Sequence, residues 1–201
     1  MSKKQEQLEK LNKEMLACSR CALRKDCTQV VPGEGPADAE IMFIGEGPGK
    51  KEDELGRPFV GAAGKFLDEM LSIINLKRED VYIANVVKCR PPENRDPLPE
   101  ETATCWPWLL EQIRTIQPLL IVTLGKHSME RFFPDQKISE IHGRALRKDF
   151  EEIGKTSLPA GRQVFYTLYH PAAALYNGSM REILIKDFKK IPKILEKIKD
   201  A

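Results

Sequence analysis

Four short apolar runs, each followed by a segment with helical character, constrain the fold of this chain more than any other feature. The runs occupy residues 40–45, 81–87, 119–124 and 164–169. Each has the length of a buried strand and is rich in aliphatic or aromatic residues. Strands that alternate with helices in this way predict parallel strands, right-handed crossovers and helices on both faces. We therefore expect a three-layer α/β/α fold around a central four-stranded parallel sheet.

The segments between the runs predict the helical layers. We expect helices at residues 4–16, 62–74 and 99–116, a short helix after Gly125 and one long helix at the C-terminal end. Residues 137–161 fit no strand–helix unit, so we expect a hairpin and a flexible loop there. Residues 156–163 look like an insertion, and nothing in their sequence indicates a function.

Length and composition favour one domain without membrane segments. A chain of 201 residues with 41% hydrophobic content buries one substantial core. Its apolar stretches are too short to cross a membrane, and residues 1–16 are too charged for a secretory signal. The net charge of +2 does not by itself require a polyanionic partner. We expect a monomer in a reducing cytoplasm.

Four of the five cysteines form two unequal pairs. Cys18 and Cys21 follow the first predicted helix and have two residues between them, whereas fifteen residues separate Cys89 from Cys105. In a reducing compartment such thiols bind metal rather than form disulfides. A zinc ribbon usually has two short Cys-x2-Cys pairs, so the wide second pair favours an iron–sulfur cluster, with zinc as the alternative. Cys27 is left over, and we interpret it as a free thiol in a loop.

The cysteine spacing also bears on domain organisation. It joins the N-terminal segment to the middle of the chain. We predict a single domain over residues 1–201, in which the N-terminal helix and cysteine loop, about residues 1–30, close the metal site.

Glycine and polar side chains follow the ends of the predicted strands. Residues 45–49 form a glycine-rich turn, Asn85 lies on the second strand, Lys126 and His127 follow the third, and His170 follows the fourth. Ligands of parallel sheets bind outside the carboxyl ends of the strands. The turn lacks a P-loop or dinucleotide-binding pattern, whereas an asparagine amide suits the edge of a nucleobase. We interpret Lys126 and His127 as surface residues outside the site.

Four motifs, in this order, resemble those of the type 4, iron–sulfur uracil-DNA glycosylases. They are GEGPGKKED at 45–53, GRPFVGAAG at 56–64, NVVKCRPPENR at 85–95 and HPAAA at 170–174. The resemblance includes the cysteine spacing and runs from Cys18 to the C-terminal helix. It implies a monofunctional enzyme of base excision repair that flips deoxyuridine out of DNA and hydrolyses its N-glycosidic bond. The products are free uracil and an abasic site.

The resemblance also implies which residues bind uracil. They are Glu46, Gly47, Glu52, Phe59, Asn85 and His170. Phe59 would stack on the base, and Asn85 would hydrogen-bond its polar edge. Glu52 would help exclude the thymine methyl group. His170 and Glu46 would be catalytic, with His170 donating toward the uracil oxygen as negative charge builds on the leaving base.

Cofactor and DNA contacts follow from the same resemblance. A structural 4Fe–4S cluster would be held by Cys18, Cys21, Cys89 and Cys105. Leu175 would wedge into the duplex, with ordinary packing as its alternative, while Arg90 and Arg95 would face the DNA backbone. In other uracil glycosylases an aspartate that positions the water stands where this chain has Gly47, so the sequence leaves open which group orients the water.

Two other functions remain open at this point. One is a superfamily relative that traps uracil-DNA covalently; such relatives carry a histidine-containing loop, and residues 90–97 contain no histidine. The other is a non-enzymatic iron–sulfur or zinc protein that binds nucleic acid, which would not need Phe59, Asn85 and His170 together.

We expect uracil-containing DNA, single- or double-stranded, as the partner and a prokaryotic cytoplasm as the location. The sequence leaves open whether a sliding clamp recruits the protein.

Overall fold

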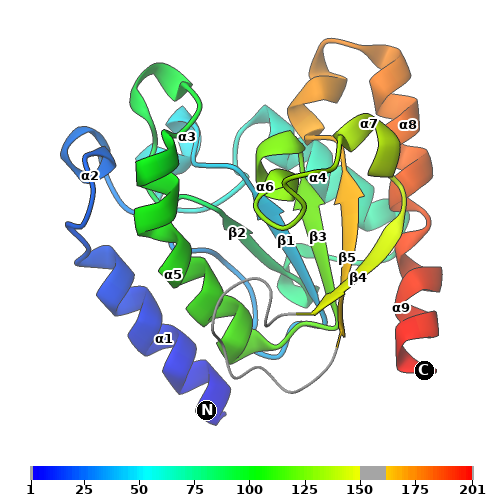
Figure 1. Cartoon of the computed structure of the whole chain (residues 1–201), viewed down its shortest axis with the longest axis horizontal. Helices are drawn as coiled ribbons and strands as arrows, with labels where there is room; N and C mark the ends of the chain where they lie inside the picture. The colour runs from blue at the N-terminus through cyan, green and yellow to red at the C-terminus, as the bar shows by residue number, and fades with distance from the viewer. Residues whose placement is uncertain (1, 150–161, 201) are drawn as a thin grey trace.

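A computed structural model describes residues 2–149 and 162–200 of the chain as three layers around one sheet (Figure 1). The strand order is β2-β1-β3-β5-β4. The strands are β1 (Ile41–Gly45), β2 (Tyr82–Asn85), β3 (Leu120–Leu124), β4 (Ala145–Asp149) and β5 (Arg162–Leu168). Four of them, β2, β1, β3 and β5, run parallel, as predicted, while β4 pairs antiparallel with β5. The sheet therefore has five strands rather than the four expected.

The fifth strand lies at the edge of the sheet, where the sequence predicted a hairpin. Of the hairpin predicted within residues 137–161, the described residues contain one strand, β4, and it pairs with β5, which the sequence predicted separately as the fourth strand. Side chains of β4 alternate between exposed and half-buried, so its sequence, ALRKD, has no apolar run to reveal it. Gln163 belongs to β5. Residues 150–161, the remainder of the segment in which a hairpin and a flexible loop were predicted, include most of the proposed insertion and lie outside the described residues.

The helices connect the strands and cover both faces of the sheet. They are α1 (Lys3–Leu16), α2 (Leu23–Asp26), α3 (Lys50–Leu55), α4 (Ala62–Ile73), α5 (Pro99–Ile116), α6 (Lys126–Glu130), α7 (Ile138–Ile141), α8 (Gly178–Phe188) and α9 (Ile191–Lys199), with 3-10 turns η1 (Arg78–Asp80), η2 (Pro92–Asn94) and η4 (Pro171–Leu175). The predicted single C-terminal helix is thus two helices. Pro192 stands in the first turn of α9, where its missing N–H is tolerated. No helix of the described residues is long and apolar enough to cross a membrane.

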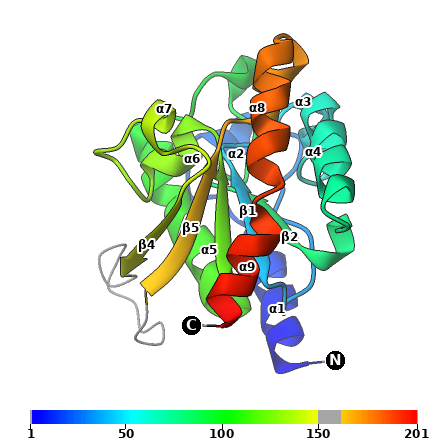
Figure 2. The same cartoon turned by 90° about the vertical axis from the view of Figure 1, so that its right-hand side faces the viewer.

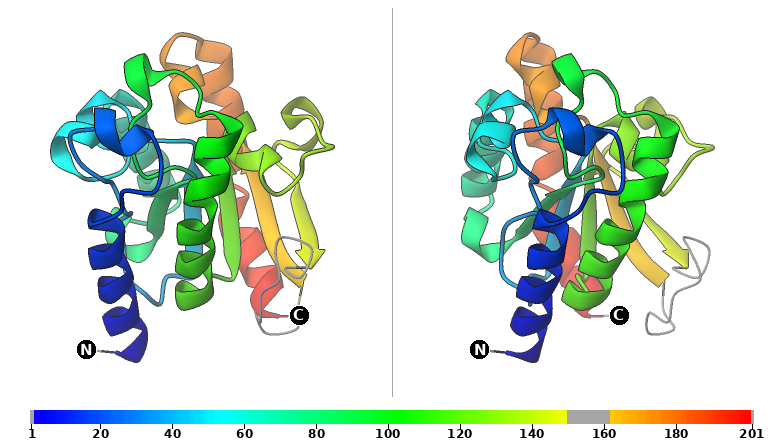
Figure 3. Two further views of the ribbon diagram at one scale, coloured as in Figure 1. Left: turned by 60° about the vertical axis from the view of Figure 1, so that its left-hand side comes forward. Right: turned by 90° about the vertical axis from the view of Figure 1, so that its left-hand side faces the viewer.

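Alternate side chains of the strands supply two hydrophobic cores. Met42 and Ile44 of β1 face a core shared with α1 and α5, whereas Ile41 and Phe43 face the core under α4, α8 and α9. Figure 2 shows α4, α8 and α9 on their side of the sheet, and both views of Figure 3 show α1 beside α5. The N-terminal helix therefore packs on the helix that carries Cys105.

The carboxyl ends of the four parallel strands meet at one edge, at the top of Figure 1. The glycine turn that leads to α3, the segment after β2, α6 and η4 all follow these ends. Segments far apart in the sequence are therefore brought together at this edge, which is where ligands bind in open parallel sheets.

Candidate active site and metal centre

Gly45, the last residue of β1, is the point at which two predicted site residues meet. The sheet register pairs Gly45 with Asn85. A Cβ atom at Gly45 would lie 2.4 Å from Asn85 Oδ1 and 2.7 Å from the ring of Phe59. Only a residue without a side chain lets both groups approach the backbone so closely. The structure thus brings the proposed stacking ring and the proposed base-reading amide together.

We expect Gly45→Ala to lower kcat/KM for uracil release by about 100-fold, because misplacement of reacting groups by about 1 Å has effects of this size. The added methyl would displace both Phe59 and Asn85. Gly178→Ala is the matched control, because a Cβ atom at Gly178 would meet nothing within 4 Å. Single-turnover kinetics of both variants, with circular dichroism to confirm folding, measure the effect. Equal rates for the two variants would contradict it.

Phe59 adopts an uncommon backbone conformation in the loop before α4. Its φ is +51°, in the left-handed region, and only 6% of the residue is exposed. A Cβ atom at Gly64 would lie 1.8 Å from the Phe59 carbonyl oxygen, so helix α4 passes directly beneath the loop. Arg78 donates from Nη1 to the Phe59 carbonyl oxygen at 3.0 Å and from Nη2 to that of Pro58 at 2.7 Å. These contacts fix the ring in place.

Glu52 holds the same loop from the other side. Its Oε1 accepts hydrogen bonds from the backbone N–H groups of Val60 and Gly61, both at 2.8 Å. This contact does not bear on the predicted exclusion of a methyl group, which stays a prediction. It does give the carboxylate a second task that the sequence did not reveal, namely to position the loop that carries Phe59.

His170 completes the group at the carboxyl edge. Its ring centroid lies 5.7 Å from that of Phe59. The Ala172 backbone N–H donates to Nδ1 at 3.2 Å, so in the neutral ring the proton is on Nε2. Burial lowers the pKa of His170 to about 4, and the Glu52 charge opposes this shift only partly. At neutral pH His170 is therefore an uncharged ring with an Nε2–H donor.

The low pKa of His170 makes folding sensitive to acid. Because the folded pKa of about 4 lies below the ordinary value of 6.5, the unfolded chain binds more protons between these values. Stability should thus fall as the pH drops from 6.5 toward 4, reaching a loss of about 3 kcal/mol. His170→Leu should lack this component. Urea unfolding of both proteins at several pH values tests it, and parallel profiles would exclude it.

Glu46 lies in the turn after β1, beside two residues that the sequence did not connect with it. One ligand-type atom from each of Glu46, Asp96 and His127 lies within 4.8 Å of the others. His127 Nε2 is 3.3 Å from Asp96 Oδ2. Burial raises the pKa of Glu46; His127 opposes this shift and Asp96 adds to it. The interpretation of His127 as a surface residue outside the site missed this proximity, although its place after a strand end was the available signal.

An open groove lies over this edge of the sheet. It is lined by Glu46, Gly47, Pro48, Gly49, Pro91, Asn94, Arg95, Asp96, Pro97 and His170. A Cβ atom at Gly47 would lie 2.8 Å from Val87 Cγ2. An aspartate at this position would therefore require Val87 to move, which explains physically why the chain has glycine there.

The residues predicted to contact DNA lie around this part of the molecule. Leu175 at the end of η4 is 39% exposed, and Tyr176 beside it is 94% exposed. Both Nη atoms of Arg95 contact the Glu101 carboxylate, at 2.9 and 2.7 Å. Arg90 donates from Nε to Asn94 Oδ1 at 2.7 Å. Both guanidinium groups therefore have partners within the chain, and their contacts with DNA stay predictions.

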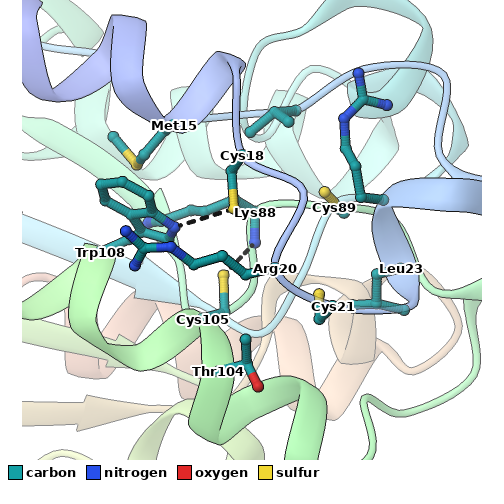
Figure 4. Close-up of a pocket in the computed structure, with 12 residues that line it drawn as sticks. Met15, Cys18, Arg20, Cys21, Leu23, Lys88, Cys89, Thr104, Cys105 and Trp108 are labelled. Atoms are coloured by element: carbon teal, nitrogen blue, oxygen red, sulfur yellow. Dashed lines mark hydrogen bonds between the residues drawn. The ribbon is translucent and has the colours of Figure 1, made fainter.

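The four paired cysteines line one cavity away from this groove (Figure 4). Cys18 and Cys21 lie between α1 and α2, Cys89 follows β2, and Cys105 lies on α5. Their thiols are free rather than joined in disulfides. The rest of the wall combines apolar side chains with polar and basic ones: Met15, Leu23, Val30 and Trp108, and Arg20, Arg24, Lys88 and Thr104. The structure thus brings together the cysteines that are far apart in the sequence.

Two N–H groups donate to sulfur in this cavity. The Trp108 indole Nε1–H donates to Cys18 Sγ at 3.4 Å, and the Lys88 backbone N–H donates to Cys105 Sγ at 3.3 Å. Burial raises the pKa of the Cys105 thiol, and the charge of Lys88 opposes the shift. Such a group of sulfurs, with N–H donors directed at them, fits a bound metal centre that takes the place of the thiol protons.

Cys27 lies closer to this cavity than the sequence suggested. It caps the end of α2, is only 8% exposed, and has a free thiol. It is near Cys89, whose pKa is raised by burial first and by Cys27 second. The thiol is buried rather than in an open loop, and the absence of a partner for it stays a prediction.

Comparisons with known proteins agree with this geometry. The model of the uracil DNA glycosylase superfamily matches residues 32–199. The type-4 uracil-DNA glycosylase of Sulfurisphaera tokodaii is 47% identical over 190 residues, which cover 92% of this chain and 83% of that protein. Those of Archaeoglobus fulgidus and Thermotoga maritima are 45% and 42% identical, covering 96% and 98% of this chain and 95% and 99% of the respective relatives. The chain therefore belongs to the uracil-DNA glycosylase superfamily, within its type-4 class.

Proposed function

We propose that this chain is a monofunctional uracil-DNA glycosylase of base excision repair, acting as a cytoplasmic monomer. One observation carries the proposal. The Phe59 ring and the Asn85 side-chain oxygen both pack against the backbone of Gly45, and the centroid of the neutral His170 ring lies 5.7 Å from that of the Phe59 ring. A stacking ring, an edge-reading amide and a hydrogen-bond donor are what a flipped base requires.

Substrate binding depends on the first two of these groups. Extrusion of deoxyuridine costs a few kcal/mol of unstacking. The Phe59 ring stacks on the face of the base, while the Asn85 amide donates to and accepts from its polar edge. Because Arg78 and Glu52 already hold the Phe59 loop, little conformational freedom is lost when the base enters.

The bond that breaks joins sugar C1′ to uracil N1. Its electron pair leaves with the base, and His170 Nε2–H donates to the uracil oxygen on which negative charge builds. Water then adds through its oxygen to C1′, and the Glu46 carboxylate accepts the proton that the water loses. The uracil anion takes a proton from solvent after release. The raised pKa of Glu46 supports its role as the proton acceptor.

The four cysteines are proposed to hold a 4Fe–4S cluster. When bound, it cross-links the N-terminal loop, the segment after β2 and helix α5, and hydrolysis needs no electron from it. Among the described residues, the one group of three or more His, Cys, Asp or Glu side chains whose possible metal-binding atoms all lie within 4.8 Å of one another is Glu46, Asp96 and His127. No three cysteine sulfurs are therefore as close together as the separation of about 3.8 Å that a tetrahedral zinc with bonds of about 2.3 Å imposes. This spacing supports the cluster over zinc.

DNA contact is proposed around the groove. The exposed Leu175 would enter the base stack, next to the still more exposed Tyr176. Arg90 lies on the segment between the groove and the cysteine cavity, where it would face a phosphate. Arg95 would act mainly by holding residues 91–97 against α5, since Glu101 occupies its guanidinium.

The test is the cleavage of an end-labelled single-stranded oligonucleotide with one uracil, with EDTA present, followed by alkali. We expect multiple-turnover formation of the shorter fragment and its loss in His170→Ala. A denaturation-resistant shift of the labelled strand would instead indicate covalent trapping. Neither product nor adduct, from a brown and iron-loaded protein, would leave a cluster-bearing protein that only binds DNA.

A further inference from the structure

Lys88 is a buried charge that the proposed mechanism does not use. Only 2% of the residue is exposed. Its Nζ donates to the Asn85 backbone carbonyl oxygen at 2.8 Å and to Gln112 Oε1 at 2.6 Å. Both acceptors are uncharged. Lysine is almost never fully buried unless it is paired with an opposite charge.

Within residues 2–149 and 162–200, no carboxylate pairs with Lys88 Nζ. Gln112, its side-chain partner, is itself buried and donates to the Pro32 carbonyl oxygen at 2.8 Å and to the Tyr82 hydroxyl at 2.9 Å. Within the described part of the chain, Lys88 contacts one group that can become negative, the Cys105 sulfur, which accepts a hydrogen bond from the Lys88 backbone N–H at 3.3 Å. A counter-charge for Lys88 is therefore available from the direction of the cysteines.

Lys88 also lines the cysteine cavity. It precedes Cys89, and its backbone N–H donates to Cys105 Sγ. Lys88 is one of the residues drawn around this cavity in Figure 4. Four thiolates around a cluster core of charge +2 leave a net charge of about −2. Of the basic residues that line this cavity, Arg20 is exposed and Arg24 is half-buried, so Lys88 is the buried one.

We propose that Lys88 is the buried counter-charge of the cysteine-bound cluster and that it links this cluster to the backbone of Asn85 in the uracil pocket. The inference rests on the cluster of the proposed function. Lys88 is then a positioning residue. Its backbone N–H contacts Cys105, a proposed cluster ligand, and its Nζ contacts the backbone of Asn85, the residue proposed to bind the edge of the base.

The charge has a measurable consequence for the cluster. Reduction adds an electron, and a nearby positive charge stabilises the reduced form. Lys88→Met removes the charge and keeps the apolar stem, so the reduction potential should shift to a more negative value. Outer-shell partners of metal sites contribute about 10- to 100-fold to metal affinity, so we expect cluster loss to a chelator to be about tenfold faster.

Gln112→Met is the matched control. It removes the other acceptor of Nζ and disturbs the same buried network, but it leaves the lysine charge in place. Iron content, voltammetry of the protein film and chelator-induced bleaching are measured for wild type and both variants. A negative shift and faster bleaching in Lys88→Met alone would support the proposal. So would a folded Lys88→Met protein that holds no iron while Gln112→Met holds it.

Three outcomes would overturn it. Lys88→Met with the potential and bleaching rate of wild type would show that the charge does not act on the cluster. Equal changes in both variants would indicate a packing network without a charge effect. Wild-type protein that contains no iron would instead refute the cofactor proposal itself, which separates that failure from the other two.

Discussion

Replacing His170 by alanine is expected to lower kcat for uracil release by about 10²- to 10³-fold, because the loss of one donor to a developing oxyanion has this effect. Binding of a uracil-containing strand should change little. The Nε2–H bond strengthens mainly as negative charge develops on the leaving base, so its loss affects the transition state more than the ground state.

His142→Gln is the control, since His142 is away from the groove and contacts Asp187 through Nδ1 at 2.7 Å. It should keep the rate of wild type, apart from a small loss of stability. Single-turnover rates with excess enzyme separate the chemical step from binding, and a titration of labelled DNA gives Kd. A His170→Ala protein with an unchanged rate would remove His170 from the catalytic group.

The sequence predicted the parts of the fold that are buried on both sides. The strands Ile41–Gly45 and Leu120–Leu124 are buried along their whole length and are almost entirely apolar, because parallel strands between two helical layers have no exposed face. The edge strand β4 alternates exposed and half-buried residues, so it gives no such signal. The break between α8 and α9 was missed because the Lys-rich amphipathic pattern continues across it.

The positions of Gly45, Asn85 and His170 at the ends of predicted strands indicated that these residues would meet at one edge of the sheet, but the sequence did not reveal how they are held. The nearness of Asn85 and Phe59 depends on the register that puts Gly45 opposite Asn85, and registers are not visible in one sequence. Two further contacts join residues whose spacing follows no motif. One runs from the Val60 backbone N–H, in the loop that carries Phe59, to Glu52, and the other from His127 to Asp96. They become apparent only when strand ends are brought together in space.

Cys89→Ala is expected to abolish iron binding and to lower Tm by more than 10 °C. Loss of the metal centre should cost about 5 kcal/mol of unfolding free energy, and each kcal/mol lowers Tm by about 2–4 °C in a domain of this size. The four proposed ligands join the N-terminal loop, the segment after β2 and helix α5. Without the metal centre, burial of these thiols offers only the modest stability of small apolar groups.

Cys27→Ala is the matched control, because Cys27 and Cys89 are neighbours and are buried to the same extent, 8% and 7% exposed. The Cys27→Ala protein should keep its iron and lose about 1 kcal/mol of unfolding free energy, as expected when a small buried side chain is shortened. Iron per chain and thermal unfolding of both variants decide between the two cysteines. If Cys27→Ala loses its iron and Cys89→Ala keeps it, then Cys27 is the ligand. The cysteine spacing would then be Cys-x2-Cys-x5-Cys followed by Cys105, and helix α5 alone would link the N-terminal segment to the rest of the domain through the cluster.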